Sequence, residues 1–178
     1  MSKVITFSRE FSKYHPKAGA PTYFKWKLLT AAYFLKLISY EQAIQNDLID
    51  HEDRFLYIPK FTTIRRGYRW KEGDRFSPRE WSGKPYCSKQ NIICPDMTIE
   101  TIYPFSYYPD QGFFMSGQRI DISKSLIPMN DGLTVEDFFN WFGQKKPFDG
   151  QLLSFKKGLH DEELKNIYKE RVVDILGL

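Results

Sequence analysis

Residues 60–90, KFTTIRRGYRWKEGDRFSPREWSGKPYCSKQ, combine two predicted strands with an excess of positive charge. The β-branched run from Thr62 to Ile64 predicts one strand, Glu72-Gly73-Asp74 predicts a turn, and Arg75 to Trp81 predict a second strand. The stretch carries nine Lys or Arg residues and three acidic ones, so the net charge of the chain, +4, is concentrated here. Aromatic residues are interleaved with these bases, a combination that suits a phosphate backbone with unstacked bases.

The composition predicts one folded domain. The chain has 178 residues, of which 42% are hydrophobic and 17% aromatic, enough for a core of its own. Cys87 and Cys94 have no Cys/His cluster at zinc-ligand spacing around them, so we expect reduced thiols, no metal and no cofactor. The N-terminus lacks the apolar core of a signal peptide, and no run approaches the roughly 20 apolar residues of a membrane span. We therefore expect a cytoplasmic protein with no membrane segment.

Before residue 60 the pattern predicts a strand at 4–7, a loop at 14–21 and a helical insertion at about 22–49. Thr22 is the expected cap of the first helix, whose apolar stripe runs from Phe24 to Ile38. Ser39 and Gln42 have capping-box spacing and predict a second, shorter helix ending near Leu48.

After residue 90, β-favouring segments at 91–93, 97–103, 113–116 and 118–123 are separated by turn signals. Thr134 is a predicted cap for a helix that contains Phe138, and 150–155 predict a final strand. The fold class is therefore α+β, a small and mostly antiparallel β-barrel decorated by helices, over residues 1–157. Residues 158–178 are predicted to form an amphipathic helix that packs on this domain.

Several motifs of the chain match a known family. They are Tyr14-His15-Pro16, Pro21-Thr22-Tyr23-Phe24, the run from Lys60 to Trp70 with Lys60-x-x-Thr63-Ile64-Arg65 at its start, the run from Trp81 to Tyr86, and Asp131-Gly132-Leu133. With these motifs, residues 3–155 resemble the ASCH family, a relative of the PUA RNA-binding domain, and in particular ASCH-like proteins of phages and Bacteroidetes. The resemblance implies a PUA-like barrel with a cleft for RNA or a modified nucleoside.

The resemblance also implies candidate catalytic residues. Some small bacterial ASCH proteins are amidohydrolases that remove the acetyl group of N4-acetylcytidine, using the Lys and Thr of this motif and a Glu just before a helix. The residues of this chain at the matching motif positions are Lys60, Thr63 and Asp131. Aspartate in place of glutamate shortens the reach of the acid by one methylene group.

Chemistry assigns a role to each of the three residues. Thr63 would be the nucleophile, Lys60 the base that activates it, and Asp131 the acid that protonates the leaving amine. Residues 60 and 63 of an unbroken strand point to opposite faces, so the site requires a bulge or turn near Lys60. The alternative is that Thr63 is an ordinary strand residue, Lys60 a solvated lysine and Asp131 an acid favoured by a helix dipole.

Further residues are candidates for contacts with the ligand. Three basic residues can bind a phosphate, or can equally form a solvated face: Arg65, Arg69 and Lys84. Three aromatic residues can stack on a base, or can equally belong to the core: Trp70, Trp81 and Tyr86. The full set predicted to contact RNA or a nucleotide is His15, Tyr23, Arg65, Arg69, Trp70, Trp81, Lys84, Tyr86 and Lys89.

Three hypotheses for the function follow. The first is binding of RNA or a nucleotide in a basic cleft, and the second is amide hydrolysis on an acylated cytidine. The third is an accessory protein that sequesters a small nucleotide or a protein partner without turnover. The sequence does not specify an oligomeric state.

Overall fold

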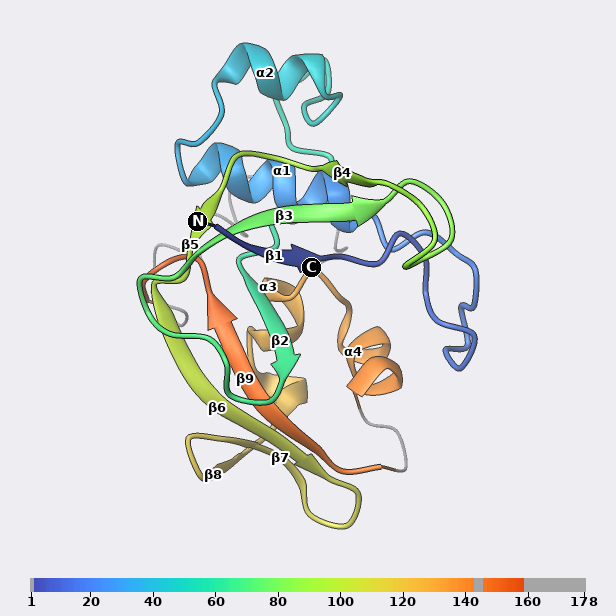
Figure 1. The fold of residues 1–178 in the computed structure, drawn as a ribbon, viewed down its shortest axis with the longest axis vertical. Coiled ribbons are helices and arrows are strands. Elements are labelled where there is room, and N and C mark those ends of the chain that lie inside the picture. The colour runs from blue at the N-terminus through green and yellow to red at the C-terminus, as the bar shows by residue number, and fades with distance from the viewer. Residues whose placement is uncertain (1, 143–145, 159–178) are drawn as a thin grey trace.

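Two β-sheets form the centre of the fold in the computed structural model, which describes residues 2–142 and 146–158 (Figure 1). The smaller sheet consists of β1 (Lys3–Thr6), β3 (Arg75–Trp81), β4 (Gln90–Ile92) and β5 (Met97–Thr98). In it β1 runs parallel to β3, and β4 and β5 pair antiparallel with β3. Helices accompany both sheets, so the α+β class is confirmed.

The larger sheet is antiparallel throughout and has the strand order β2-β9-β6-β7-β8. Its strands are β2 (Thr62–Arg66), β6 (Thr101–Tyr108), β7 (Gly112–Met115), β8 (Gln118–Ile120) and β9 (Phe148–Ser154). The pairing of β9 with β2 depends on Gly150, because a Cβ at this position would lie 2.1 Å from the carbonyl oxygen of Arg65. The last strand of the described residues, β9, therefore lies inside this sheet, between β2 and β6.

The predicted β-barrel is not closed in the part of the chain that the structure describes. The two strands of residues 60–90 belong to different sheets, because β2 pairs with β9 whereas β3 pairs with β1, β4 and β5. The facing edge strands β1 and β2 are not hydrogen-bonded to each other in the described residues. The sheets are therefore open on this side.

The helices begin close to their predicted starts. The first, α1 (Phe24–Phe34), starts one residue later than predicted, after Tyr23 in a left-handed conformation with φ of 58°, while Thr22 Oγ1 accepts a hydrogen bond from the backbone of Phe24. The short helix α2 (Tyr40–Gln45) has the predicted capping box. Helix α4 (Val135–Phe142) is capped by Thr134, as predicted. A short α3 (Ile127–Asn130) and a 3-10 turn (Ile122–Lys124) were not predicted.

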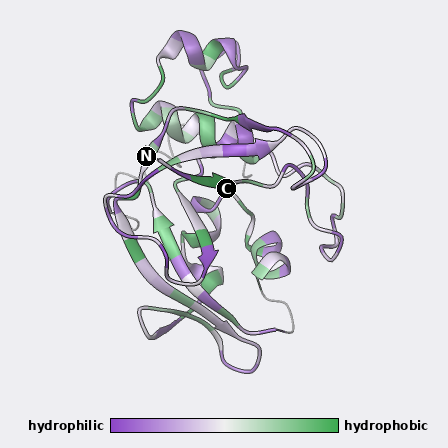
Figure 2. Ribbon diagram, viewed as in Figure 1, coloured by the Kyte–Doolittle hydropathy of each residue, from purple (hydrophilic) through white to green (hydrophobic). Residues whose placement is uncertain are grey.

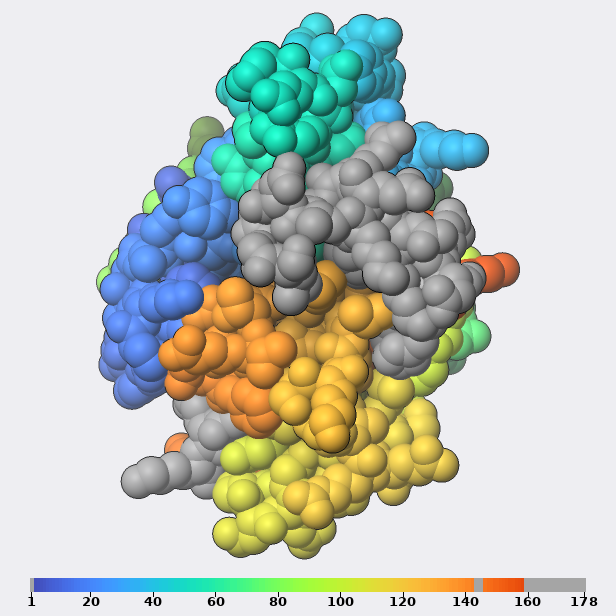
Figure 3. Space-filling model, turned by 180° about the vertical axis from the view of Figure 1, so that it is seen from behind, coloured from blue at the N-terminus to red at the C-terminus, as the bar shows by residue number. Residues whose placement is uncertain are grey.

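Aromatic side chains dominate the core between these elements. Figure 2 shows hydrophobic residues along β1 and in the second half of β9, and hydrophilic ones at the end of β2. Phe61, Phe76, Phe105 and Phe138 are fully buried. Seen from behind, the N-terminal segment, α4 and the segment around α3 lie side by side (Figure 3).

Two further predictions concern the C-terminus and membranes. The predicted C-terminal helix lies outside the described residues. Within the described residues, no helix has the length and apolar character needed to cross a membrane.

Candidate functional site

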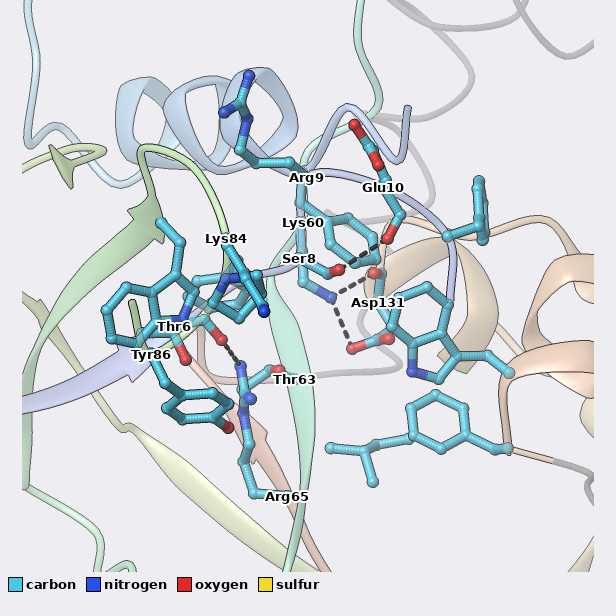
Figure 4. A pocket seen from close by; sticks show the side chains of 18 of the residues that line it. Thr6, Ser8, Arg9, Glu10, Lys60, Thr63, Arg65, Lys84, Tyr86 and Asp131 are labelled. Carbon is cyan, nitrogen blue, oxygen red and sulfur yellow. Dashed lines mark hydrogen bonds and ion pairs between the residues drawn. The ribbon is translucent and has the colours of Figure 1, made fainter. Parts of the chain in front are cut away.

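A pocket of about 730 Å³ lies on the open side, between the ends of the two sheets. Four parts of the chain form most of its wall, and Figure 4 shows their side chains converging. They are residues 6–11 at the end of β1 and after it, residues 63–65 of β2, Trp81 at the end of β3 with residues 83–86 after it, and Trp141 with Phe142 of α4. Phe24, Lys60 and Asp131 complete the lining.

Lys60 and Asp131 form a buried ion pair at this pocket. Lys60 Nζ lies 2.8 Å from Asp131 Oδ1 and also donates to the backbone carbonyl oxygen of Asp131. The two side chains are 1% and 4% exposed. The structure therefore brings together two of the three residues that the motif resemblance assigns to one site.

Lys60 and Thr63 share the pocket because the strand begins after Lys60. β2 starts at Thr62, and the preceding backbone is held by other segments: Lys60 N donates to Lys27 O at 2.9 Å and Phe61 N donates to Asn130 O at 2.8 Å. The second bond also brings the end of α3, and with it Asp131, to Lys60. The irregular backbone required by the sequence analysis is present.

Burial dominates the electrostatics of this pair. It lowers the pKa of Lys60 from 10.5 to about 8, against the opposing attraction of Asp131. Burial also raises the pKa of Asp131, although Lys60, Arg65 and Lys27 all act in the opposite direction. A lysine with a pKa near neutrality can serve as a base as well as a cation.

Arg65 lies beside Thr63 on the pocket side of β2. Its Nη2 donates to Thr6 O at 3.0 Å, and its guanidinium carbon lies 5.0 Å from the centre of the Phe7 ring. Its Nε is buried and has no hydrogen-bond partner among the described residues. Burial lowers the pKa of this arginine to about 10, so it remains charged at neutral pH.

The loop after β3 forms the outer wall of the pocket. Ser88 organises it, since Ser88 Oγ accepts a hydrogen bond from Gly83 N and donates one to Lys84 O. The ring centres of Trp81 and Tyr86 lie 5.3 Å apart, and Tyr86 is 88% exposed. This loop therefore places two rings and the charge of Lys84 at the mouth.

Seven of the residues predicted from sequence line the pocket: Lys60, Thr63, Arg65, Trp81, Lys84, Tyr86 and Asp131. Trp70 does not, because it is buried in the core against Phe76. Arg69 lies over the Trp70 ring outside the pocket, and Lys89 is an exposed residue behind the loop.

His15 and Tyr23 also lie outside the pocket lining. His15 is buried and stacks on Phe11, with Nδ1 accepting from Lys17 N and Nε2 facing the carbonyl oxygen of Asp137. Tyr23 belongs to a separate aromatic group with Trp26 and Tyr57. His15 thus supports a pocket wall from behind, and Tyr23 is on a different surface.

Sequence reasoning missed part of the site. Residues 6–11 carry no local motif and reach the pocket because β1 pairs with β3. Trp141 and Phe142 were not among the predicted site residues, yet they line the pocket. Lys27 was not predicted either, and its Nζ donates to Gly132 O at 2.7 Å, beside Asp131.

Comparisons with known proteins add no identification. No protein-family model, curated protein or solved structure matches this chain. Over residues 2–142 and 146–158, no group of three or more His, Cys, Asp or Glu is placed to hold a metal ion. The pocket itself presents a buried lysine–aspartate pair, a hydroxyl, an arginine and several aromatic rings.

Proposed function

We propose that the protein binds a nucleotide in this pocket, either free or as an unstacked residue of RNA. The observation that carries the proposal is the convergence of aromatic rings and cations on one hollow. Trp81 and Tyr86 offer faces on which a base can stack, and Arg9, Arg65 and Lys84 supply positive charge.

The size of the pocket favours one nucleotide over a long polymer segment. Pockets of roughly 300–1,000 Å³ enclose small ligands, and the volume of about 730 Å³ lies within this range. The motif resemblance to ASCH and PUA-like proteins adds to the same proposal, since it implies a cleft for RNA or a modified nucleoside.

Titration of tryptophan fluorescence with nucleosides, nucleotides and short single-stranded RNA tests this function. We expect saturable binding that Trp81→Ala and Tyr86→Ala each weaken roughly tenfold, the scale of one lost stacking contact. Tyr40→Ala is the matched control, because Tyr40 is an exposed tyrosine on α2 outside the pocket. Absence of binding across the panel would overturn the proposal.

Salt dependence separates RNA from a compact nucleotide. Each phosphate contact with a cation releases counterions, so affinity for an RNA that follows the protein surface falls steeply between low and moderate salt. The affinity for a single nucleotide falls much less over the same range of salt. Binding of neither, together with capture of one defined protein, would favour the sequestering hypothesis.

Amide hydrolysis is a second candidate, favoured by the placement of Thr63 in the same pocket as the Lys60–Asp131 pair. Neutral Lys60 would take the proton of the Thr63 hydroxyl as its oxygen attacks the acyl carbon, and the protonated lysine or a protonated Asp131 would return a proton to the leaving amine as the C–N bond breaks. Water would then hydrolyse the Thr63 ester and release the carboxylic acid. The pKa of Lys60, about 8, gives a usable neutral fraction at neutral pH.

Mass spectrometry of acylated nucleosides incubated with the protein tests this activity. Thr63→Ala should abolish product formation while nucleoside binding is retained. Thr62→Val is the matched control, because Thr62 is the adjacent threonine, buried and not part of the pocket lining. No product from the unsubstituted protein on any acylated nucleoside would exclude the hydrolase.

A further inference from the structure

Lys27 connects three parts of the candidate site that are distant in sequence. Its carbonyl oxygen accepts from Lys60 N at 2.9 Å, and its Nζ donates to Gly132 O at 2.7 Å. Gly132 has φ of +75°, and a Cβ there would lie 3.2 Å from Lys27 Cδ and 3.4 Å from Lys60 Cβ. The two lysine stems therefore pass close together over a glycine.

The charges around this contact do not balance. Lys27, Lys60 and Arg65 all interact with Asp131, and Lys27 shares Asp137 with Lys17. These are four cations and two carboxylates. Arg69 adds repulsion on Arg65, and buried His15 contacts the backbone of both Lys17 and Asp137. The pocket lining also includes Arg9 and Lys84 but only one further acid, Glu10, which again leaves positive charge in excess.

The hydrogen bonds of the pocket floor are also incomplete. Arg65 donates to Thr6 O through Nη2, but its Nε is a buried donor with no partner among the described residues. Thr63, which lines the same floor, offers a hydroxyl that can donate or accept. Buried unpaired donors and uncompensated cations are costly, and a ligand that supplies the missing acceptor and charge would relieve both costs.

We propose that the ligand carries a phosphoryl group that binds at the pocket floor against Lys60, Thr63 and Arg65, with Lys27 as a positioning residue behind them. This inference rests on the nucleotide-binding function proposed above and specifies its ligand: a nucleoside monophosphate rather than a neutral nucleoside. The phosphoryl oxygens supply acceptors to the guanidinium and the hydroxyl, and their charge offsets the excess of cations. The base then lies toward Trp81 and Tyr86 at the mouth.

The protonation of the two lysines supports this assignment. Burial lowers the pKa of Lys27 and of Lys60 to about 8 each, although Asp131 attracts both lysines and acts in the opposite direction. A bound phosphoryl group favours their charged forms and so raises both pKa values. Binding is therefore expected to take up protons near pH 8 and to weaken between pH 7 and pH 9.5.

Calorimetric titration with a matched ligand series tests the proposal. The series is a nucleoside, its 5′- and 3′-monophosphates, and inorganic phosphate, each at pH 7 and pH 9.5. We expect one monophosphate to bind at least about tenfold more tightly than the nucleoside at pH 7, the factor provided by one charge-assisted hydrogen bond. Lys27→Met should reduce this phosphate advantage several-fold and diminish its pH dependence. Lys25→Met is the control, because Lys25 lies on the same helix over the Trp26 ring and does not line the pocket.

The outcomes separate this inference from the function on which it rests. Equal affinity for nucleoside and both monophosphates would overturn the phosphoryl site and leave the nucleotide pocket standing. If the monophosphate still binds more tightly than the nucleoside by the same factor in Lys27→Met and in Lys25→Met, Lys27 is not a positioning residue of the site. Since the ligand series is run on the unsubstituted protein, the phosphoryl site is tested even if a variant does not fold.

Discussion

Two lysine–aspartate pairs lie close together in this protein and differ in one respect. Lys60 and Asp131 are 2.8 Å apart, and Lys17 and Asp137 are 2.9 Å apart. Both aspartates are buried, but the side chain of Lys60 is 1% exposed whereas that of Lys17 is 50% exposed. Burial of the cation, and not the contact distance, therefore separates a candidate functional pair from a surface pair.

The origin of the difference lies in the segments that deliver each lysine. Lys60 precedes β2 and is enclosed by α1 and the end of α3. Lys17 belongs to the N-terminal segment, which lies beside α4 at the surface (Figure 3). Water screens the Lys17–Asp137 pair. The Lys60–Asp131 pair lies in a low-dielectric environment, where loss of one partner strongly lowers the free energy of unfolding.

The largest effect is expected for Asp131→Ala. It leaves Lys60 buried without its counter-charge, and removing one partner of a buried ion pair costs about 3–5 kcal/mol of the free energy of unfolding. Urea denaturation measures this loss. The double variant Lys60→Met, Asp131→Leu should recover most of it, because no buried charge remains. A loss below about 1 kcal/mol in the single variant would place this pair in the same class as the surface pair.

The next effect is expected for Gly132→Ala, which disturbs the same pair from the backbone. Gly132 has a positive φ and a Cβ would press on Lys27 and Lys60, so we expect a loss of about 1–3 kcal/mol, measured by thermal or urea unfolding. Gly117→Ala is the control, since Gly117 also has a positive φ but a Cβ there would meet no atom within 4 Å. Equal losses in the two variants would show that the contact with the lysines has no cost of its own.

A smaller effect concerns pH. In the folded protein the pKa values of Lys27 and Lys60 are both about 8, below their ordinary value of 10.5, so between these values the unfolded chain binds more protons and the free energy of unfolding rises with pH. Cys94 acts in the opposite direction above pH 9, because burial raises its pKa to about 12. Urea midpoints between pH 7.5 and pH 9 should therefore increase, and Lys27→Met should reduce the increase by removing one of the two lysines. A falling midpoint in the parent protein would contradict this assignment.

The smallest effect is expected for Lys17→Met. The pair it breaks is half-exposed, so the loss should stay below about 1 kcal/mol. The same urea titration measures it, and ligand affinity at the pocket should be nearly unchanged. A loss as large as that of Asp131→Ala would invalidate the distinction between the two pairs.

Local sequence signals predicted the elements well and the assembly less well. The capping box at Ser39 and Gln42 and the cap at Thr134 are confirmed, because such motifs depend on residues within one helical turn. The closed barrel is not found in the described residues, because the partners of β2 and β3 depend on distant segments: β9 and β1. Residue type alone does not encode these pairings.

The candidate site shows the same division. Lys60, Thr63 and Asp131 were predicted together from motifs and are found at one pocket. Trp70 and Trp81 look equivalent in sequence, yet Trp70 is in the core, where its backbone pairs with the Gln151 side chain, and Trp81 faces the pocket. Lys27 was missed because an apolar stripe indicates which helix face is buried, but not that a lysine beside it reaches a backbone carbonyl.

The open side of the two sheets also has a mechanical consequence. Near residues 98–101 the chain passes directly from one sheet to the other, and main-chain bonds from Ile99 N to Asp74 O and from Glu100 N to Ser154 O hold the junction. On the pocket side, the contact from Arg65 to Thr6 O is made by a side chain. The two sheets are thus linked by main-chain hydrogen bonds at one end and by a single side-chain hydrogen bond beside the pocket, a geometry that allows the pocket end to open and close. Amide hydrogen exchange along the edge strands β1 and β2 should slow when a ligand fills the pocket. Unchanged exchange there would show that the two sheets already have a fixed relative position without ligand.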